Sequence, residues 1–105
     1  MLATFAGPAA ALHCGADIRR LARREGLAIR ASVHVGEVEL VGNDVRGIAV
    51  HEAARILSEA GPDEILVSET TRALAHASGL GFESRGVREL KGLPGQWSLF
   101  SFVEA

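Results

Sequence analysis

The sequence is poor in several residue types, and each shortage excludes something. Cys14 is the only cysteine in 105 residues. No internal disulfide can therefore form, and a reducing compartment, the cytoplasm, is expected. Lys91 is the only lysine among eleven basic residues, which we attribute to genomic composition. No apolar run reaches membrane-spanning length and no secretory signal is present, so we expect no membrane contact. The net charge of −2 gives no general attraction to nucleic acid.

What is present describes an ordinary globular chain, with 48% hydrophobic and 23% charged residues. We expect a single domain, residues 1–105, of the α+β class, in which helices pack on a mixed sheet. Apolar periodicity and turn residues predict the elements in order. They are the end of a strand at 2–5, a helix at about 8–25, strands at 28–35 and 38–40, a helix reaching 57, a strand at 65–67, a helix at 68–77, and a hairpin of 82–90 and 97–103.

The first helix is expected to begin at Gly7-Pro8 and to stop at Gly26. Helical spacing predicts a buried apolar stripe on this helix and a set of solvated cations on its later turns. The stripe consists of Ala11, Cys14, Ile18 and Leu21, and the cations are Arg19, Arg20, Arg23 and Arg24. In the last strand, Trp97, Leu99 and Val103 alternate, so they are expected to share one face and supply much of the core. On the strand at 28–35, His34 falls on the polar face, where a structural role is favoured.

A second helix follows a segment rich in turn residues, 42–47. Val50, Ala53 and Leu57 recur at helical spacing and predict its apolar stripe. We expect the turn to lead directly into this helix.

Three candidate site residues lie on this helix and its entry turn. His51 and Arg55 are four residues apart, so they project from one side of the helix, and Asp44 lies just before it. An acid, an imidazole and a guanidinium suit a ligand that has both a base and phosphates. A plain surface is the alternative: Arg55 paired with Glu52 or Glu59, a solvated His51, and Asp44 as an N-cap.

Several chemistries fail on inspection. The run from His51 starts like a zinc-peptidase helix, but Arg55 stands where the second histidine ligand would be, and a guanidinium cannot replace it. The four histidines and Cys14 show no metal-ligand spacing. The glycine-containing turn at 42–47 lacks the Gly-Lys-Ser/Thr of a phosphate-binding loop, and no Gly-x-Ser-x-Gly elbow occurs.

Four runs together resemble the catalytic domain of class III adenylate/guanylate cyclases. The runs are Leu2–Phe5 with Gly7-Pro8, Arg30–Val38, Gly47–Arg55 and Glu89–Trp97. The resemblance covers the whole chain but only the second half of the family domain. It implies a partial ferredoxin-like cyclase fold that lacks the first strands of the full domain.

The resemblance implies conversion of ATP to cyclic AMP and pyrophosphate, with Mg²⁺ or Mn²⁺ held by two aspartates. Arg55 matches the family's transition-state arginine, and Asp44 matches the acid that reads the base. His51 stands where the family has asparagine, so its role is open. The metal aspartates belong upstream of Met1. The chain is therefore expected to bind no metal and to be inactive alone.

The resemblance also implies partners, because family sites form between two domains. A missing internal strand would leave sheet edges exposed, and exposed edges recruit strands. We therefore expect a homodimer, a strand-swapped oligomer, or pairing with a cyclase half that supplies the metal ligands. The alternative is a non-catalytic module that binds nucleotide or only dimerises. A nucleic-acid reader built on the arginine helix is the remote third reading.

Overall fold

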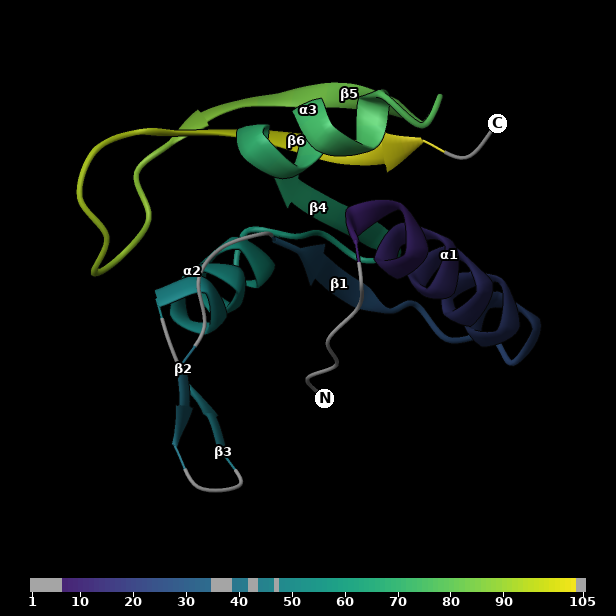
Figure 1. Cartoon of the computed structure of the whole chain (residues 1–105). Coiled ribbons are helices and arrows are strands. Elements are labelled where there is room, and N and C mark those ends of the chain that lie inside the picture. The colour runs from purple at the N-terminus through teal and green to yellow at the C-terminus, as the bar shows by residue number, and fades with distance from the viewer. Residues whose placement is uncertain (1–6, 35–38, 42–43, 47, 104–105) are drawn as a thin grey trace.

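The computed structural model describes residues 7–34, 39–41, 44–46 and 48–103, and between 39 and 50 it describes the backbone alone. Nine elements follow one another along these ranges (Figure 1). They are α1 (Pro8–Arg24), β1 (Arg30–Val33), β2 (Glu39–Val41), β3 (Asp44–Arg46), α2 (Ile48–Leu57), β4 (Glu64–Ser68), α3 (Glu69–His76), β5 (Gly81–Arg88) and β6 (Trp97–Val103). The order agrees with the sequence prediction except for β3. The strand predicted at 2–5 lies outside the described residues.

The strand β3 corrects the prediction of a turn that leads directly into α2. It pairs antiparallel with β2, with Asp44 opposite Val41. The strand has three residues, begins with Asp44 and is flanked in the sequence by Asn43 and Gly47. These residues favour turns and are depleted in strands, so the local composition does not indicate a strand. Asp44 is therefore a strand residue and not the N-cap of α2.

The main sheet has four strands in the order β1-β4-β6-β5. β1 lies parallel to β4, while β6 pairs antiparallel with both β4 and β5. The sheet is mixed, as predicted for an α+β chain. Among the described residues β1 pairs on one side only, so it forms an edge of this sheet.

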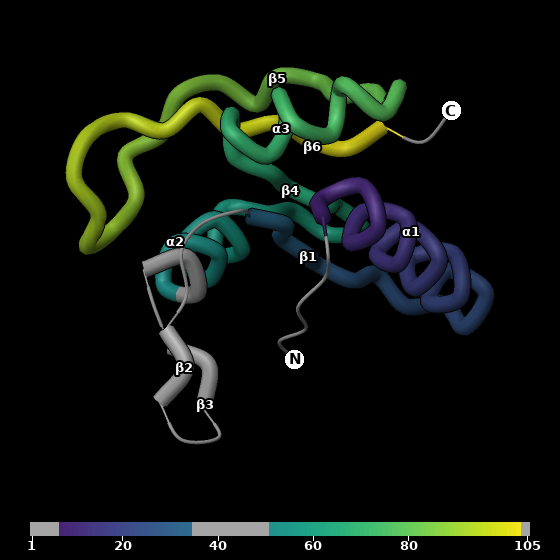
Figure 2. The backbone as a smooth tube through the Cα atoms, viewed as in Figure 1, coloured from purple at the N-terminus to yellow at the C-terminus, as the bar shows by residue number. Residues whose placement is uncertain are grey.

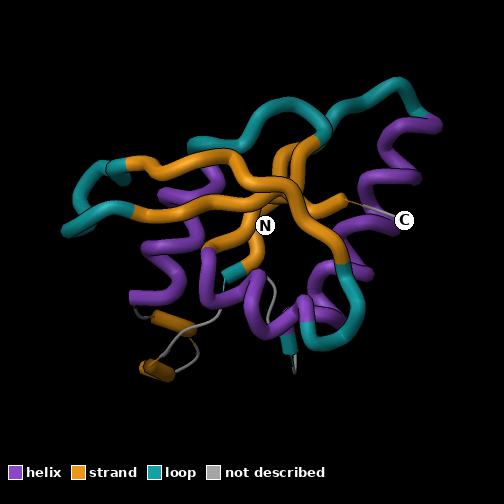
Figure 3. Tube along the Cα trace, turned by 90° about the horizontal axis from the view of Figure 1, so that it is seen from above, coloured by secondary structure: helices purple, strands orange, loops and turns teal. Residues whose placement is uncertain are grey.

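Two apolar clusters fill opposite faces of the sheet, and β4 contributes to both. The first cluster contains Leu12, Ala16, Ile65, Val67, Ala75 and Phe102, and so joins the sheet to α1 and α3. The second cluster contains Ile56, Ala60, Leu66, Leu90 and Leu99, and joins the sheet to α2 and to the loop between β5 and β6. Seen from above, α1 and α2 lie on opposite sides of the strands (Figure 3).

Helix α1 has the predicted ends but a different buried face. Pro8 stands in its first turn, and beyond its C-terminus Gly26 adopts φ 73° and lets Leu27 N–H donate to Ala22 O at 2.8 Å. Its fully buried residues are Leu12, Ala16 and Arg19. Two members of the predicted stripe are exposed, Ile18 by 40% and Leu21 by 58%. The prediction of the stripe was therefore wrong by about one position.

Arg19 corrects the prediction that the arginines of α1 form a solvated face. It is only 5% exposed, and its guanidinium donates to the carbonyl oxygen of Asp63 at 3.4 Å. Arg23 binds the Asp63 carboxylate, with Nε donating at 2.7 Å. The turn before β4 thus anchors the arginine face of α1.

The C-terminal hairpin forms as predicted, with one exception in its core. Gly95 has a positive φ of 76°, while the hydrogen-bonded turn of the loop lies at Lys91-Gly92, where Leu93 N–H donates to Leu90 O at 3.0 Å. Leu99 is buried and Trp97 is half-buried against the second cluster, whereas Val103 is 40% exposed and supplies no core. The loop between the two strands reaches the side of the molecule where α2 lies (Figure 2).

Candidate functional site

Helix α2, which carries two of the predicted site residues, is held on the sheet by Ile56 and by a hydrogen bond from β1. Ile56 is fully buried in the second cluster, while Leu57, which the sequence placed in the apolar stripe, is 38% exposed. Ser32 Oγ donates to the carbonyl oxygen of Ala53 at 2.8 Å. The Val50 side chain lies outside the described part of the chain. The helix is therefore fixed at its middle and its end.

His51 is exposed on α2 and lies beside the loop that connects β5 and β6. A Cβ atom placed on Gly92 would be 3.7 Å from His51 Nε2. Gly92 has φ 81°, so the loop approaches the imidazole with bare backbone at a position where a side chain would also be strained.

Arg55 is half-buried one turn further along α2. Its Nε lies buried and has no hydrogen-bond partner among the described residues. The alternative in which Arg55 pairs with Glu52 or Glu59 is not seen in the described part of the chain, where Glu52 is bound by His34 instead. A buried donor without a partner is costly, so Arg55 is suited to an acceptor that the described residues do not supply.

The structure brings His51 and Arg55 onto one side of α2, as their spacing predicted. It places Asp44 at the start of β3 and describes only its backbone. The convergence of all three residues therefore stays a prediction.

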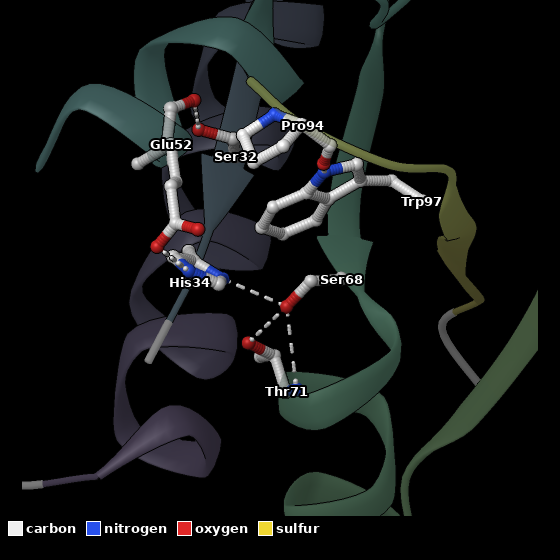
Figure 4. A network of polar contacts seen from close by, with 8 residues as sticks. Ser32, His34, Glu52, Ser68, Thr71, Pro94 and Trp97 are labelled. Atoms are coloured by element: carbon white, nitrogen blue, oxygen red, sulfur yellow. Dashed lines mark hydrogen bonds and ion pairs between the residues drawn. The ribbon is translucent and has the colours of Figure 1, made fainter. Parts of the chain in front are cut away.

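The sequence reading missed a buried polar network around His34 (Figure 4). Its imidazole bridges β4 and α2: Nδ1 lies 2.8 Å from Ser68 Oγ and Nε2 lies 3.0 Å from Glu52 Oε1. The His34 side chain is 5% exposed. The alternation that placed His34 with Ser32 on one face of the strand was a signal for it, but the partner Glu52 follows only from the fold.

Glu52, His34 and Ser68 have the order of a hydrolase triad, but Ser68 is not placed to attack a substrate. It is 2% exposed, its Oγ accepts from Thr71 N–H at 3.4 Å as the N-cap of α3, and it lies 2.9 Å from Thr71 Oγ1. A nucleophile needs access and a free lone pair. The network is therefore internal architecture.

A shallow cavity of about 520 Å³ opens at the loop between β5 and β6. It is lined by Glu89, Leu90, Lys91, Leu93, Gly95 and Gln96. Leu90 and Leu93 also pack in or against the second cluster, which contains Ile56 of α2. The loop that lines the cavity therefore also packs with α2.

The residues described here do not fit a bound metal. No group of three or more His, Cys, Asp or Glu side chains in these ranges is arranged to hold one. We therefore assign no chemical step of this chain to a metal. No helix in the described ranges is long and apolar enough to cross a membrane.

Three solved structures that carry the name of a cyclase resemble the fold of this chain. An adenylate/guanylate cyclase/hydrolase from Silicibacter pomeroyi matches with a TM-score of 0.81 and 24% identity, over 95% of this chain and 64% of that one. The adenylyl cyclase CyaB from P. aeruginosa matches with a TM-score of 0.61 and 20% identity, over 86% of this chain and 52% of that one. No protein-family model and no curated protein matches the chain.

A third match is an adenylate cyclase from Trypanosoma brucei, with a TM-score of 0.51 and 21% identity, over 66% of this chain and 34% of that one. The chain spans less than two thirds of each of these three structures. At these identities the likeness is one of fold. It confirms the cyclase-type α+β fold predicted from the sequence.

Proposed function

We propose that this chain forms the nucleotide-contacting part of a cyclase-type site and binds a nucleoside triphosphate, with ATP favoured. The observation that carries the proposal is Arg55, a half-buried arginine whose Nε has no acceptor among the described residues, on a helix of a cyclase-type fold. Phosphate oxygens, like carboxylate oxygens, are acceptors that a planar guanidinium fork can bind with two hydrogen bonds.

The reaction served by such a site joins the ribose 3′ oxygen to the α-phosphorus of ATP and breaks the bond from that phosphorus to the β-phosphate oxygen. Cyclic AMP and pyrophosphate result, and the hydroxyl proton passes to solvent. Arg55 would hold the negative charge that develops on the phosphate oxygens. Asp44 would accept a hydrogen bond from the adenine amino group, and His51 would contact the ribose. We propose that catalysis requires a partner segment that supplies the metal ligands, and that the chain alone is inactive.

Calorimetric titration with ATP tests the proposal. Arg55→Ala should weaken ATP binding by roughly 10- to 100-fold, because a hydrogen bond to a charged group contributes about 1.5–3 kcal/mol. Arg55→Lys should recover only part of this, since lysine keeps the charge but not the fork. Arg24→Ala, which truncates an exposed arginine at the end of α1, is the matched control and should bind as the wild type does. Equal affinity of the Arg55→Ala and Arg24→Ala variants would contradict the proposal.

A second candidate is a pairing module that joins two copies of this chain. The observations that favour it are the edge strand β1 and the exposed apolar side chains Ile18 and Leu21 on α1. An open edge strand presents unpaired backbone groups that a second strand can satisfy. A protein with this role alone would give no heat with ATP.

A further inference from the structure

We propose that His34 is a positioning residue for the nucleotide site, and that its imidazole fixes α2, and with it Arg55, against the sheet through Glu52. This inference rests on the proposed function. It concerns residues that lie beneath the site and do not touch the nucleotide.

The His34 imidazole joins three elements at one buried point (Figure 4). His34 directly follows β1, Glu52 lies on α2, and Ser68 ends β4. The Glu52 side chain is 18% exposed and that of His34 is 5% exposed, so little water competes for their contact. Hydrogen bonds in such surroundings are stronger and more directional than they are at the surface.

The direction of each hydrogen bond follows from the chemistry of the partners. An ionised carboxylate only accepts, so His34 Nε2 carries a proton and donates it to Glu52. Ser68 Oγ has both a donor and lone pairs, and it is in contact with Thr71 as well as with His34 Nδ1. The hydroxyl can therefore serve either state of Nδ1. The hydrogen bond to Glu52 can form in one direction only, from Nε2–H to the carboxylate. It is therefore the hydrogen bond that fixes the orientation of the imidazole.

The contact to Glu52 lies close to Arg55 along the helix. Glu52 and Arg55 are three residues apart and so are neighbours on the helix surface. The next residue after Glu52, Ala53, is the one whose carbonyl accepts from Ser32 Oγ. Two consecutive residues of α2 are thus bound by two side chains from one face of the β1 segment, which sets how far the helix stands from the sheet.

Trp97 closes the remaining side of the imidazole. Its ring meets that of His34 edge-on, with centroids 5.8 Å apart and planes at 64°. The indole N–H donates to Pro94 O at 3.4 Å, in the loop that passes His51. His34 therefore contacts α2 directly through Glu52, and it is linked to the loop before β6 only through Trp97.

Two amide substitutions separate the two hydrogen bonds of His34. In His34→Gln the amide nitrogen reaches the place of Nε2 and keeps the bond to Glu52. In His34→Asn it reaches the place of Nδ1 and keeps only the bond to Ser68. We expect His34→Gln to bind ATP within about threefold of the wild type and His34→Asn to bind about tenfold or more weakly, because the donors of Arg55 must be held in place.

A stability measurement distinguishes positioning from simple support. If His34 only stabilises the fold, the two variants should lose ATP affinity in proportion to their loss in midpoint of denaturation, and that result would overturn the inference. Glu52→Ala should match His34→Asn in affinity. Glu59→Ala, past the end of the same helix, should match the wild type.

The Arg55 Nε–H resonance in an NMR spectrum provides a readout that does not require ATP. Glu52→Ala should shift this resonance and Glu59→Ala should not. If wild-type protein fails to bind ATP while the resonance shifts as expected, the proposed function is wrong and the positioning holds. If wild type binds ATP and the resonance stays unmoved in Glu52→Ala, the positioning is wrong and the function stands.

Discussion

Asp63 illustrates how much a single residue contributes to this fold. It is a non-glycine residue with a positive φ of 61°, in the turn before β4. Its carboxylate binds Arg23, and its carbonyl oxygen accepts from the buried Arg19. Aspartate tolerates the left-handed region better than most side chains do. One residue thus makes the turn and also anchors the C-terminal half of α1.

Substitution of Asp63 should separate the backbone effect from the ion-pair effect. Asp63→Ala should lower the free energy of unfolding by about 1–2 kcal/mol, because alanine is strained at this φ. Asp63→Gly loses the same carboxylate without the strain, so it should cost at most about 1 kcal/mol, the size of a surface ion pair. Urea denaturation of the two variants measures the difference. Equal losses would mean that the turn carries no backbone preference.

At this scale the sequence predicted only what one helix can arrange. His51 and Arg55 share a side of α2 because four residues make about one turn, and this needs no tertiary information. His34 meets Glu52 across 18 positions of sequence and Ser68 across 34, and no local pattern contains such pairs. The network that supports the candidate site was therefore beyond prediction from one sequence.

Among the elements, the strands and helix ends were predicted better than the helix faces. Glycine and proline punctuate the chain at Gly26, at Gly61-Pro62 and at Pro94-Gly95, and the structure turns at each of these. The start of α3 is also set by local contacts: Ser68 is its N-cap, and Glu69 in its first turn accepts a hydrogen bond from Arg72. The hydrogen bond to Glu69 raises the pKa of the Arg72 guanidinium above its usual value.

The predicted stripe of α1 was wrong by about one residue; in α2 the prediction was wrong for Leu57, and the Val50 side chain lies outside the described part of the chain. Leu12 and Ile56 are fully buried, while Leu21 and Leu57 are exposed. Each helix carries more apolar residues than one face can bury, so hydrophobicity alone does not select the face. On α1 the buried face includes Arg19, whose guanidinium donates to the carbonyl oxygen of Asp63.

Two leucines of α1 should respond very differently to truncation. Leu12→Ala should lower the free energy of unfolding by about 2–5 kcal/mol, because it leaves a cavity in the first cluster. Leu21→Ala should change it by no more than about 0.5 kcal/mol, because this side chain is 58% exposed. Thermal or urea denaturation measures both. If only the Leu21→Ala variant loses much free energy of unfolding, Leu21 is buried as the sequence predicted.

For the whole molecule, the class was predictable but the strand order was not. Alternating helical and strand patterns indicated an α+β chain with a mixed sheet. The order β1-β4-β6-β5 places β6 between β4 and β5, although β6 is the last strand in sequence. The strand order depends on which apolar faces pack together. In β4, Val67 packs in the first cluster and the neighbouring Leu66 packs in the second cluster, on the opposite face. The local sequence pattern therefore does not predict which strands pair.

In the described ranges β1 pairs on one side only and α1 exposes apolar side chains, which leads to a prediction about association. α1 packs over β1 through the first cluster, so Ile18 and Leu21 stand on the helix that borders the edge strand. Sedimentation velocity should show a dimer that dissociates on dilution. Replacing both Ile18 and Leu21 by lysine should weaken association by about tenfold or more, since burial of one such side chain contributes roughly 1.5–3 kcal/mol.

The matched control for association is Leu74→Lys, which changes an apolar side chain of similar exposure, 51%, on α3. It should leave the dimer intact, because α3 lies over β4 and β6 and not at the β1 edge. A wild-type chain that stays monomeric at all concentrations would remove the pairing module as a candidate. If the control dissociates as readily as the α1 double variant, the contact lies on another face, and the edge of β1 is not where the second copy binds.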